Sequence, residues 1–271
     1  MNGGHTPERW HVRTSCIVTA FDGDQLSLPL ARFDAALSTP ELLDAAKGIA
    51  RILKTWTPSQ TQNQLHLSEA LTEKVHAWHQ AWNPEGNAVA GWTFRGDAFK
   101  SLDLPSLPAE TLRASQHRLR ILHGVYGSLR PFDRFMPVRL EMGERWCHDA
   151  AFKNMASFWK QRLPRVVVES ADALGKGTVI LNLASAEYGD VALHGVPAER
   201  IVTCAFLEHR NGQLKAISSF AKTARGAMAR HVLLHGLQNP KELEEFNELG
   251  YLFSSEESTP NKKVFIRTLT P

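Results

Sequence analysis

The sequence predicts an α+β fold, a single compact domain in which a mixed β-sheet is packed by helices. Apolar residues at helical spacing occur in both halves of the chain, and short runs of β-branched residues occur in the second half. The two patterns do not alternate regularly, as they would in a parallel βαβ fold. No stretch of the 271 residues has a linker-like composition, so we expect one domain spanning 1–271.

Four helices are predicted before residue 165. The first begins at Ser38-Thr-Pro-Glu41, where a hydroxyl cap, a proline and a glutamate form a typical helix start, and it runs to about residue 56. A second follows Ser68. The other two are expected at about 108–122, ending at Gly124, and at 148–163.

Strands and a hairpin are predicted in the second half. Residues 165–169 form a short and ambiguous strand, and 178–183 form a buried one. Asn211-Gly212 predicts a hairpin between two strands, because both residues tolerate a positive φ. Helices are then expected at 220–234 and 240–249, and a final strand at 264–268.

The composition argues against a membrane-spanning, secreted or disulfide-rich protein. No apolar run approaches the roughly 18 residues of a membrane span, and the run from Cys16 to Ala20 is too short for a signal peptide. Three widely spaced cysteines favour a reducing cytosol over a disulfide framework. With no CxxC, P-loop or GxGxxG, we expect a cytoplasmic protein without a metal site, cofactor or membrane partner.

The net charge of +3 conceals local asymmetry. Residues 209–241 contain six lysines and arginines and no acid, and residues 111–145 contain seven arginines against three acids. If these segments share a face, their field favours an anionic partner. Alternatively the charges point in different directions and only keep the protein in solution.

Glycines, arginines and short polar residues cluster in five segments. These are FRGDAFK from Phe94, LRILHGVYGSLRPFD from Leu119 continuing to RLEMG, NLASAEY from Asn182, SSFAKTARG from Ser218 and FNELGY from Phe246. They resemble the FxGDxY, LxGLYGxLRPxDxxxPYRLEMG, NLASxEY, SFYAKxARGxM and FNxxGY motifs of the bacterial YaaA family, in the same order. The resemblance covers about residues 90–268 well and the first 90 loosely, with 1–15 as an extra N-terminal segment.

The resemblance implies a YaaA-like fold and a cytosolic protein tied to oxidative stress, which binds DNA through a positive cleft with a helix-hairpin-helix element. The Gly124-Val-Tyr-Gly127 turn is the candidate for that element, because a glycine-rich turn exposes N–H groups that can cradle a phosphate. The alternative is an ordinary helix C-cap glycine. The candidate anion-binding residues are Arg118, Arg120, Gly124, Gly127, Arg130, Lys222 and Arg225.

Lys222 and Arg225 share one face of a predicted helix. They lie three residues apart among alanines and Gly226, so a phosphate or another backbone could approach closely. A solvated charged face is the alternative.

A polar pocket is expected where residues follow the strand at 178–183. Such strand ends present ligands in open α/β sheets. The predicted pocket residues are Asp97, Arg139, Glu141, Asn182, Ser185, Glu187, Tyr188 and Asn247. The catalytic candidates are Glu141, Glu187, Ser185 and Tyr188, with either glutamate as a general base. Alternatively, Arg139 and Glu141 pair only to brace the fold.

The chain departs from the family pattern at several positions. Thr19 replaces the lysine of an N-terminal SPAKxLD motif and Cys16 its serine, although Asp22 is kept. Phe99 and Val138 replace tyrosines of two other motifs. An activity that depends on those groups would be lost or changed in this protein.

Two functions are compatible with these features. The first is a DNA-binding protein in a peroxide stress context, contacting duplex or branched DNA through phosphates, with little dependence on sequence and strong dependence on salt. The second is an enzyme built on the same scaffold that acts on a small anionic molecule, such as a nucleotide or a natural-product intermediate. A scaffold without chemistry is a third reading.

Overall fold

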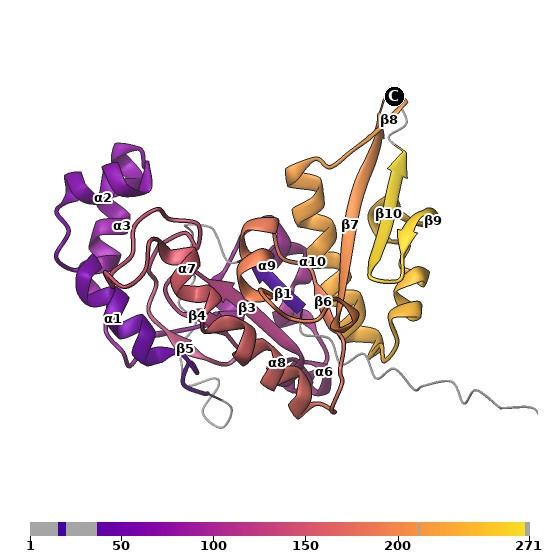
Figure 1. Cartoon of the computed structure of the whole chain (residues 1–271), viewed down its shortest axis with the longest axis horizontal. Helices are drawn as coiled ribbons and strands as arrows, with labels where there is room; N and C mark the ends of the chain where they lie inside the picture. The colour runs from indigo at the N-terminus through magenta and orange to yellow at the C-terminus, as the bar shows by residue number, and fades with distance from the viewer. Residues whose placement is uncertain (1–15, 20–36, 211, 269–271) are drawn as a thin grey trace, which may run out of the picture.

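Parallel strand pairs organise the chain. In this computed structural model, which describes residues 16–19, 37–210 and 212–268, β1 (Cys16–Thr19) pairs in parallel with β3 (Leu119–His123), and β4 (Gly127–Leu129) pairs antiparallel with β3 (Figure 1). A small ribbon joins β2 (Ala88–Val89) to β5 (Arg134–Phe135).

A five-stranded sheet lies beside the first one. Its members are β6 (Ile180–Asn182), β7 (Ile201–Arg210), β8 (Gln213–Lys215), β9 (Leu252–Thr259) and β10 (Lys262–Thr268). The order is β6-β7-β10-β9, with β8 paired to β7. The β7 strand is parallel to both β6 and β10, and β6 contacts β1, which brings the two sheets together.

Helices cover these strands on both sides (Figure 1). The α-helices within the described residues are α1 (Leu43–Leu53), α2 (Pro58–Leu65), α3 (Glu69–Ala81), α4 (Ala90–Thr93), α5 (Asp97–Leu102), α6 (Ala109–Arg118), α7 (Met155–Lys160), α8 (Leu163–Ala173), α9 (Ala186–Ala192) and α10 (Ser218–His235). Short 3₁₀ turns are η2 (Leu104–Ser106), η3 (Ala198–Arg200), η4 (Pro240–Glu245) and η5 (Glu248–Gly250).

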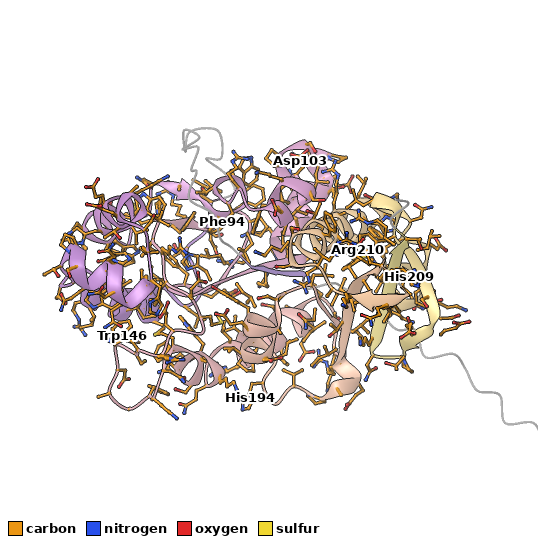
Figure 2. The ribbon with its side chains drawn as sticks, turned by 90° about the horizontal axis from the view of Figure 1, so that it is seen from above. Phe94, Asp103, Trp146, His194, His209 and Arg210 are labelled. Carbon is orange, nitrogen blue, oxygen red and sulfur yellow. The ribbon has the colours of Figure 1, made fainter. Side chains whose placement is uncertain are left out.

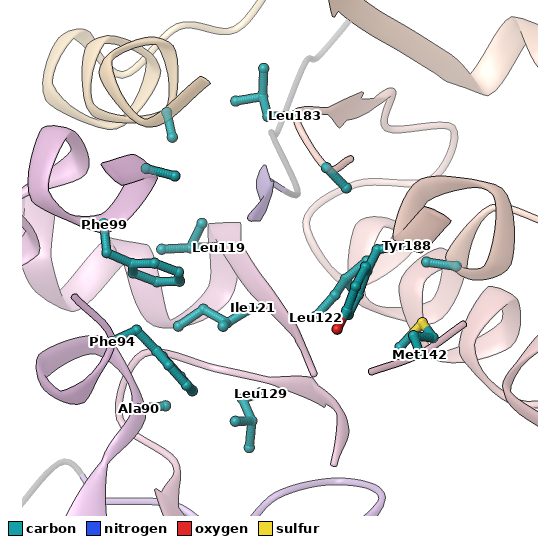
Figure 3. Packing of buried hydrophobic residues seen from close by; sticks show 14 of the residues in the cluster. Ala90, Phe94, Phe99, Leu119, Ile121, Leu122, Leu129, Met142, Leu183 and Tyr188 are labelled. Atoms are coloured by element: carbon teal, nitrogen blue, oxygen red, sulfur yellow. The ribbon is translucent and has the colours of Figure 1, made fainter. Parts of the chain in front are cut away.

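One hydrophobic core runs through most of the molecule, and the described residues form a single compact domain. Its centre packs Phe99 of α5 against Leu119 and Ile121 of β3, while Tyr188 of α9 lies beside Leu122 (Figure 3). This arrangement confirms the predicted mixed α and β architecture.

Several predicted elements are confirmed. A helix follows Ser68, and α10 matches the helix expected at 220–234. The buried strand expected at 178–183 is β6, and the final strand is β10. The predicted hairpin joins β7 to β8 with Gly212 at φ 73°, while Asn211 lies outside the described residues.

Two of the predicted elements change type in the structure. The helix expected at 108–122 ends at Arg118, because the next five residues are fully buried and pair with β1 and β4. The strand expected at 165–169 belongs to α8. That helix carries a proline in its first turn and buries Leu163, Val167 and Ala171 at a spacing of four, so the valine run follows the helical face.

The first and fourth predicted helices start later than expected. Ser38 does not cap a helix, because its hydroxyl donates to Asp133 Oδ1 at 2.6 Å and its backbone bridges the same residue. Helix α1 therefore begins at Leu43. The helix expected at 148–163 is reduced to α7, which starts at a capping box formed by Asn154 and Ser157.

Candidate functional site

Four of the predicted pocket residues come together where the loop at 139–144 meets α9. The Tyr188 hydroxyl donates to Glu141 Oε2 at 3.0 Å, and Arg139 Nη2 lies 3.6 Å from Glu141 Oε1. The backbone N–H of Gly143 donates to Glu187 Oε1 at 2.6 Å. Arg139 and Glu141 do pair, as one reading expected, and the pair also faces a phenol and a second carboxylate.

Local backbone geometry holds this group in place. Strand β6 ends at Asn182, whose Oδ1 accepts from the N–H of Ala184 and so turns the chain into α9. At Gly143 a Cβ atom would lie 2.7 Å from Glu187 Oε1, so only glycine allows the carboxylate to reach the backbone N–H. As expected from the sequence, Asn182, Ser185, Glu187 and Tyr188 lie at or just after the end of the buried strand β6.

Burial changes the proton affinity of these groups. Burial raises the pKa of Glu141, opposed by the hydrogen bond from Tyr188 and the charge of Arg139. It also raises the pKa of Tyr188, as do the two nearby carboxylates. Glu144, which sequence reasoning missed, has its pKa raised to about 7 by burial and by the charges of Glu141 and Glu187. The three-residue spacing of Glu141 and Glu144 was the available signal.

His79 holds the backbone of the loop that carries Arg139. Its Nε2 donates to the backbone carbonyl of Arg139 at 3.0 Å, and burial lowers its pKa to about 4. A neutral imidazole therefore holds the backbone of Arg139. Within the described residues, no group of three or more His, Cys, Asp or Glu side chains is arranged to hold a metal ion.

The raised pKa of Glu144 predicts a pH effect on stability. In the unfolded chain a glutamate titrates near ~4.3, so between that pH and about 7 the folded protein holds a proton that the unfolded chain has lost. Stability should therefore fall as pH rises through this window. In urea unfolding, the free energy of unfolding of Glu144→Gln relative to that of wild type should be higher at pH 8 than at pH 5. An equal difference at both pH values would contradict the raised pKa of Glu144.

Three arginines expected to contact phosphate are held by internal bonds. Arg118 Nη2 donates to Leu237 O at 2.7 Å. Arg120 is 4% exposed and donates to Ser170 Oγ, and Arg130 binds the carboxylate of Asp133. These bonds brace the fold.

The two basic segments also do not form one row. Arg118 contacts the residues just beyond the C-terminal end of α10. Lys222 lies in the first turns of that helix, roughly 20 Å away along its axis. Arg118 and Lys222 therefore lie too far apart to contact one phosphate group together.

The 124–127 turn joins two strands, β3 and β4, and not two helices. The whole turn is buried, and Trp159 Nε1 donates to Gly124 O at 2.8 Å. The N–H groups of Val125 and Tyr126 donate to His123 Nδ1. The prediction of a phosphate-binding helix-hairpin-helix element at Gly124 and Gly127 is therefore wrong, since these N–H groups are already used inside the protein.

Lys222 and Arg225 occupy the N-terminal half of α10, next to α5. Lys222 is exposed and Arg225 is partly buried, and neither has a hydrogen bond or ion pair with a described residue. The two helices touch at Gly226, where a Cβ would lie 1.9 Å from Ala98 O. Asp97, at the start of α5, is exposed beside this contact.

The remaining predicted residues are distributed differently. Ser185 immediately precedes α9, next to the Glu141 group. Asn247 lies at an exposed turn whose neighbour Phe246 packs on His231 of α10, outside that group. Phe99 and Val138, which replace tyrosines, are both buried in the core. Asp22 and the segment 1–15 lie outside the described residues.

The described helices include none that combines the length and apolar character needed to cross a membrane.

Comparison with known proteins gives one consistent result. Residues 22–257 match the family described as "Peroxide stress protein YaaA". A UPF0246 protein of Cereibacter sphaeroides (strain ATCC 17029) is 37% identical over 238 residues, covering 86% of this chain and 91% of that protein. A UPF0246 protein of Ruegeria sp. (strain TM1040) is 37% identical over 234 residues, covering 86% of this chain and 92% of that protein.

Proposed function

The chain belongs to the YaaA peroxide stress protein family, and we propose that it binds the sugar–phosphate backbone of DNA, duplex or branched, in a cytoplasmic response to peroxide. A basic segment of the chain without acidic residues carries this proposal. Arg210 and Lys215 flank the tip of the β7–β8 hairpin, and Lys222 and Arg225 follow on α10. From His209 to Lys241 the sequence contains no acidic residue. Cations in this arrangement hold phosphates without reading base sequence.

The hairpin extends this surface away from the body of the protein. Figure 1 shows β8 at the upper tip, far from α6 and α8 at the bottom. In Figure 2, His209 and Arg210 lie in the same half of the molecule as α10, and Trp146 lies at the opposite end. The proposed binding surface consists of this projecting arm and the helix at its base, and it does not include the internally bonded arginines.

Fluorescence anisotropy with labelled duplex and branched DNA tests the proposal. We expect Lys222→Glu/Arg225→Glu to weaken binding at low salt by at least about tenfold, because each lost charged contact costs roughly 1.5–3 kcal/mol. The matched control is Lys47→Glu/Lys54→Glu, which makes the same charge change on exposed positions at α1 and should lower affinity much less. Absence of binding by wild type at low salt, or equal losses in both variants, would reject DNA as the partner.

A small anionic ligand is a second candidate, favoured by the environment of Arg225. Burial lowers the pKa of this side chain, and no carboxylate among the described residues compensates its charge. The neighbouring thiol belongs to Cys204, which follows Thr203, and Thr203 pairs with Asn182 at the end of β6. An anion bound by Arg225 would therefore lie near the strand end that leads to the Glu141 group.

The two candidates respond differently to loss of an acid. Glu141→Gln removes a carboxylate whose pKa is raised by burial, which suits it to proton transfer. In the anisotropy titration this variant should bind DNA as well as wild type. If an anionic small molecule found by thermal-shift screening is turned over by wild type, Glu141→Gln should retain its binding and lose the turnover.

A further inference from the structure

A separate hollow of about 680 Å³ opens between α6, α8 and the start of α1. Basic side chains dominate its lining, with four arginines and a histidine: Arg120, Arg130, Arg162, Arg165 and His117. Its acids are Glu41 and Glu169. We propose that this hollow binds the phosphate group of a small molecule, a phosphomonoester or inorganic phosphate. The proposal is independent of DNA binding on α10.

The hollow has a preorganised cation in Arg120. Its Nη2 and Nε donate to Ser170 Oγ at 2.7 and 3.1 Å, and its Nη1 donates to the carbonyl oxygens of Gln116 and Leu119. These bonds fix the guanidinium in place, and Arg120 as a whole is only 4% exposed. None of these direct partners is a carboxylate; the charges that act on Arg120 from further away are those of Glu41, Asp133 and Arg130.

Ser170 supplies a hydroxyl donor beside that charge. Its oxygen accepts from Arg120, and its own O–H donates to no described residue. Since Ser170 also lines the hollow, the hydroxyl can donate to a ligand oxygen. A guanidinium fixed beside a hydroxyl is a suitable pair of donors for a phosphate.

The other cations surround this pair. The Arg162 guanidinium is held over the ring of Phe158 at 3.8 Å, and Arg130 is held by Asp133. Arg165 is mostly exposed and is paired with Glu169 at 2.8 Å. Two fixed arginines and one movable arginine therefore converge on the same space.

The acids and the shape favour a small ligand over a polymer. Glu41 lies 3.5 Å from Arg130 Nη1, and Glu169 pairs with Arg165, so two carboxylates are part of the lining. Like charges brought close together are unfavourable, so a ligand with a single phosphate suits a lining that contains two carboxylates better than an extended polyanion does.

Isothermal titration with inorganic phosphate and with glycerol 3-phosphate, at low ionic strength, tests this proposal. Wild type should bind both saturably. Ser170→Ala should bind about threefold more weakly and Arg165→Gln/Ser170→Ala about tenfold more weakly, while Lys47→Gln/Lys54→Gln should match wild type. Circular dichroism checks that each variant is folded; both changed positions are at least partly exposed.

Absence of saturable heat up to 10 mM of either probe, or an unchanged affinity in Arg165→Gln/Ser170→Ala, would overturn the proposal. A short DNA duplex is the competitor that distinguishes ligand size. If the duplex displaces phosphate, and its own binding is lost in Arg165→Gln/Ser170→Ala, the hollow is a polymer site and the small-ligand proposal is wrong. Neither Lys222 nor Arg225 lines the hollow, so failure of the DNA proposal leaves this result unaffected.

Discussion

Glu208→Leu is expected to destabilise the protein by about 3–5 kcal/mol, because it leaves a charged partner uncompensated. Glu208 is 0% exposed; it accepts from the Tyr251 hydroxyl and, at Oε2, from Arg267 Nε at 2.9 Å. The Arg267 guanidinium in turn stacks over Phe220 at 4.4 Å. The carboxylate thus joins β7, β10 and the start of α10 at the base of the hairpin arm.

A double variant distinguishes the effect of losing the carboxylate from the effect of leaving the positive charge of Arg267 without a partner. Glu208→Leu/Arg267→Met removes both charges, and replacing a buried pair by apolar residues often restores stability. In chemical denaturation the double variant should therefore unfold at a clearly higher denaturant concentration than Glu208→Leu. If both variants unfold at the same denaturant concentration, the pair is not the anchor that the geometry indicates.

Gly226→Ala is expected to lower the free energy of unfolding by about 2–3 kcal/mol, against the trend of helix propensity. In a helix interior alanine normally gains roughly 1 kcal/mol over glycine. Here the new Cβ would lie 1.9 Å from Ala98 O, so α5 would have to move away from α10. Overpacking typically costs about 1–3 kcal/mol and occasionally more. Because the atom displaced here belongs to the backbone, which yields less than a side chain, we expect a cost of about 3–4 kcal/mol before the gain in helix propensity is subtracted.

Thermal unfolding measures this effect directly, with a loss of roughly 4–12 °C expected for a chain of this size. Gly48→Ala in α1 is the matched control. Its Cβ would meet only the His148 side chain, at 3.3 Å, so a change near zero or a small gain is expected. A Gly226→Ala protein as stable as wild type would show that the two helices are packed less closely than the structure has them.

The fold could be predicted where local pattern and tertiary packing agree. Asn211-Gly212 and the apolar run at 178–183 identified the hairpin and β6. Where they disagree, packing decides. The run at 119–123 contains Arg120 and His123 among three apolar residues and has no clear period, and its pairing with β1 and β4 makes it a strand.

The site was predictable in its residue types and less so in its contacts. Arg139, Glu141, Glu187 and Tyr188 do meet, because the strand end before α9 directs two of them toward the loop that carries the others. The hydrogen bond of Arg118 could not be predicted from the sequence, because the carbonyl oxygen that accepts it belongs to Leu237, 119 residues further along the chain.

The central claim is that cations of the hairpin and α10 neutralise DNA phosphates, and the salt dependence of binding tests it most directly. If Arg210, Lys215, Lys222 and Arg225 each contact a phosphate, log K should fall against log salt with a slope of about −3 to −4. Lys222→Gln/Arg225→Gln should reduce the magnitude of that slope by about 2. A flat salt dependence in wild type, or an unchanged slope in the variant, would contradict the account.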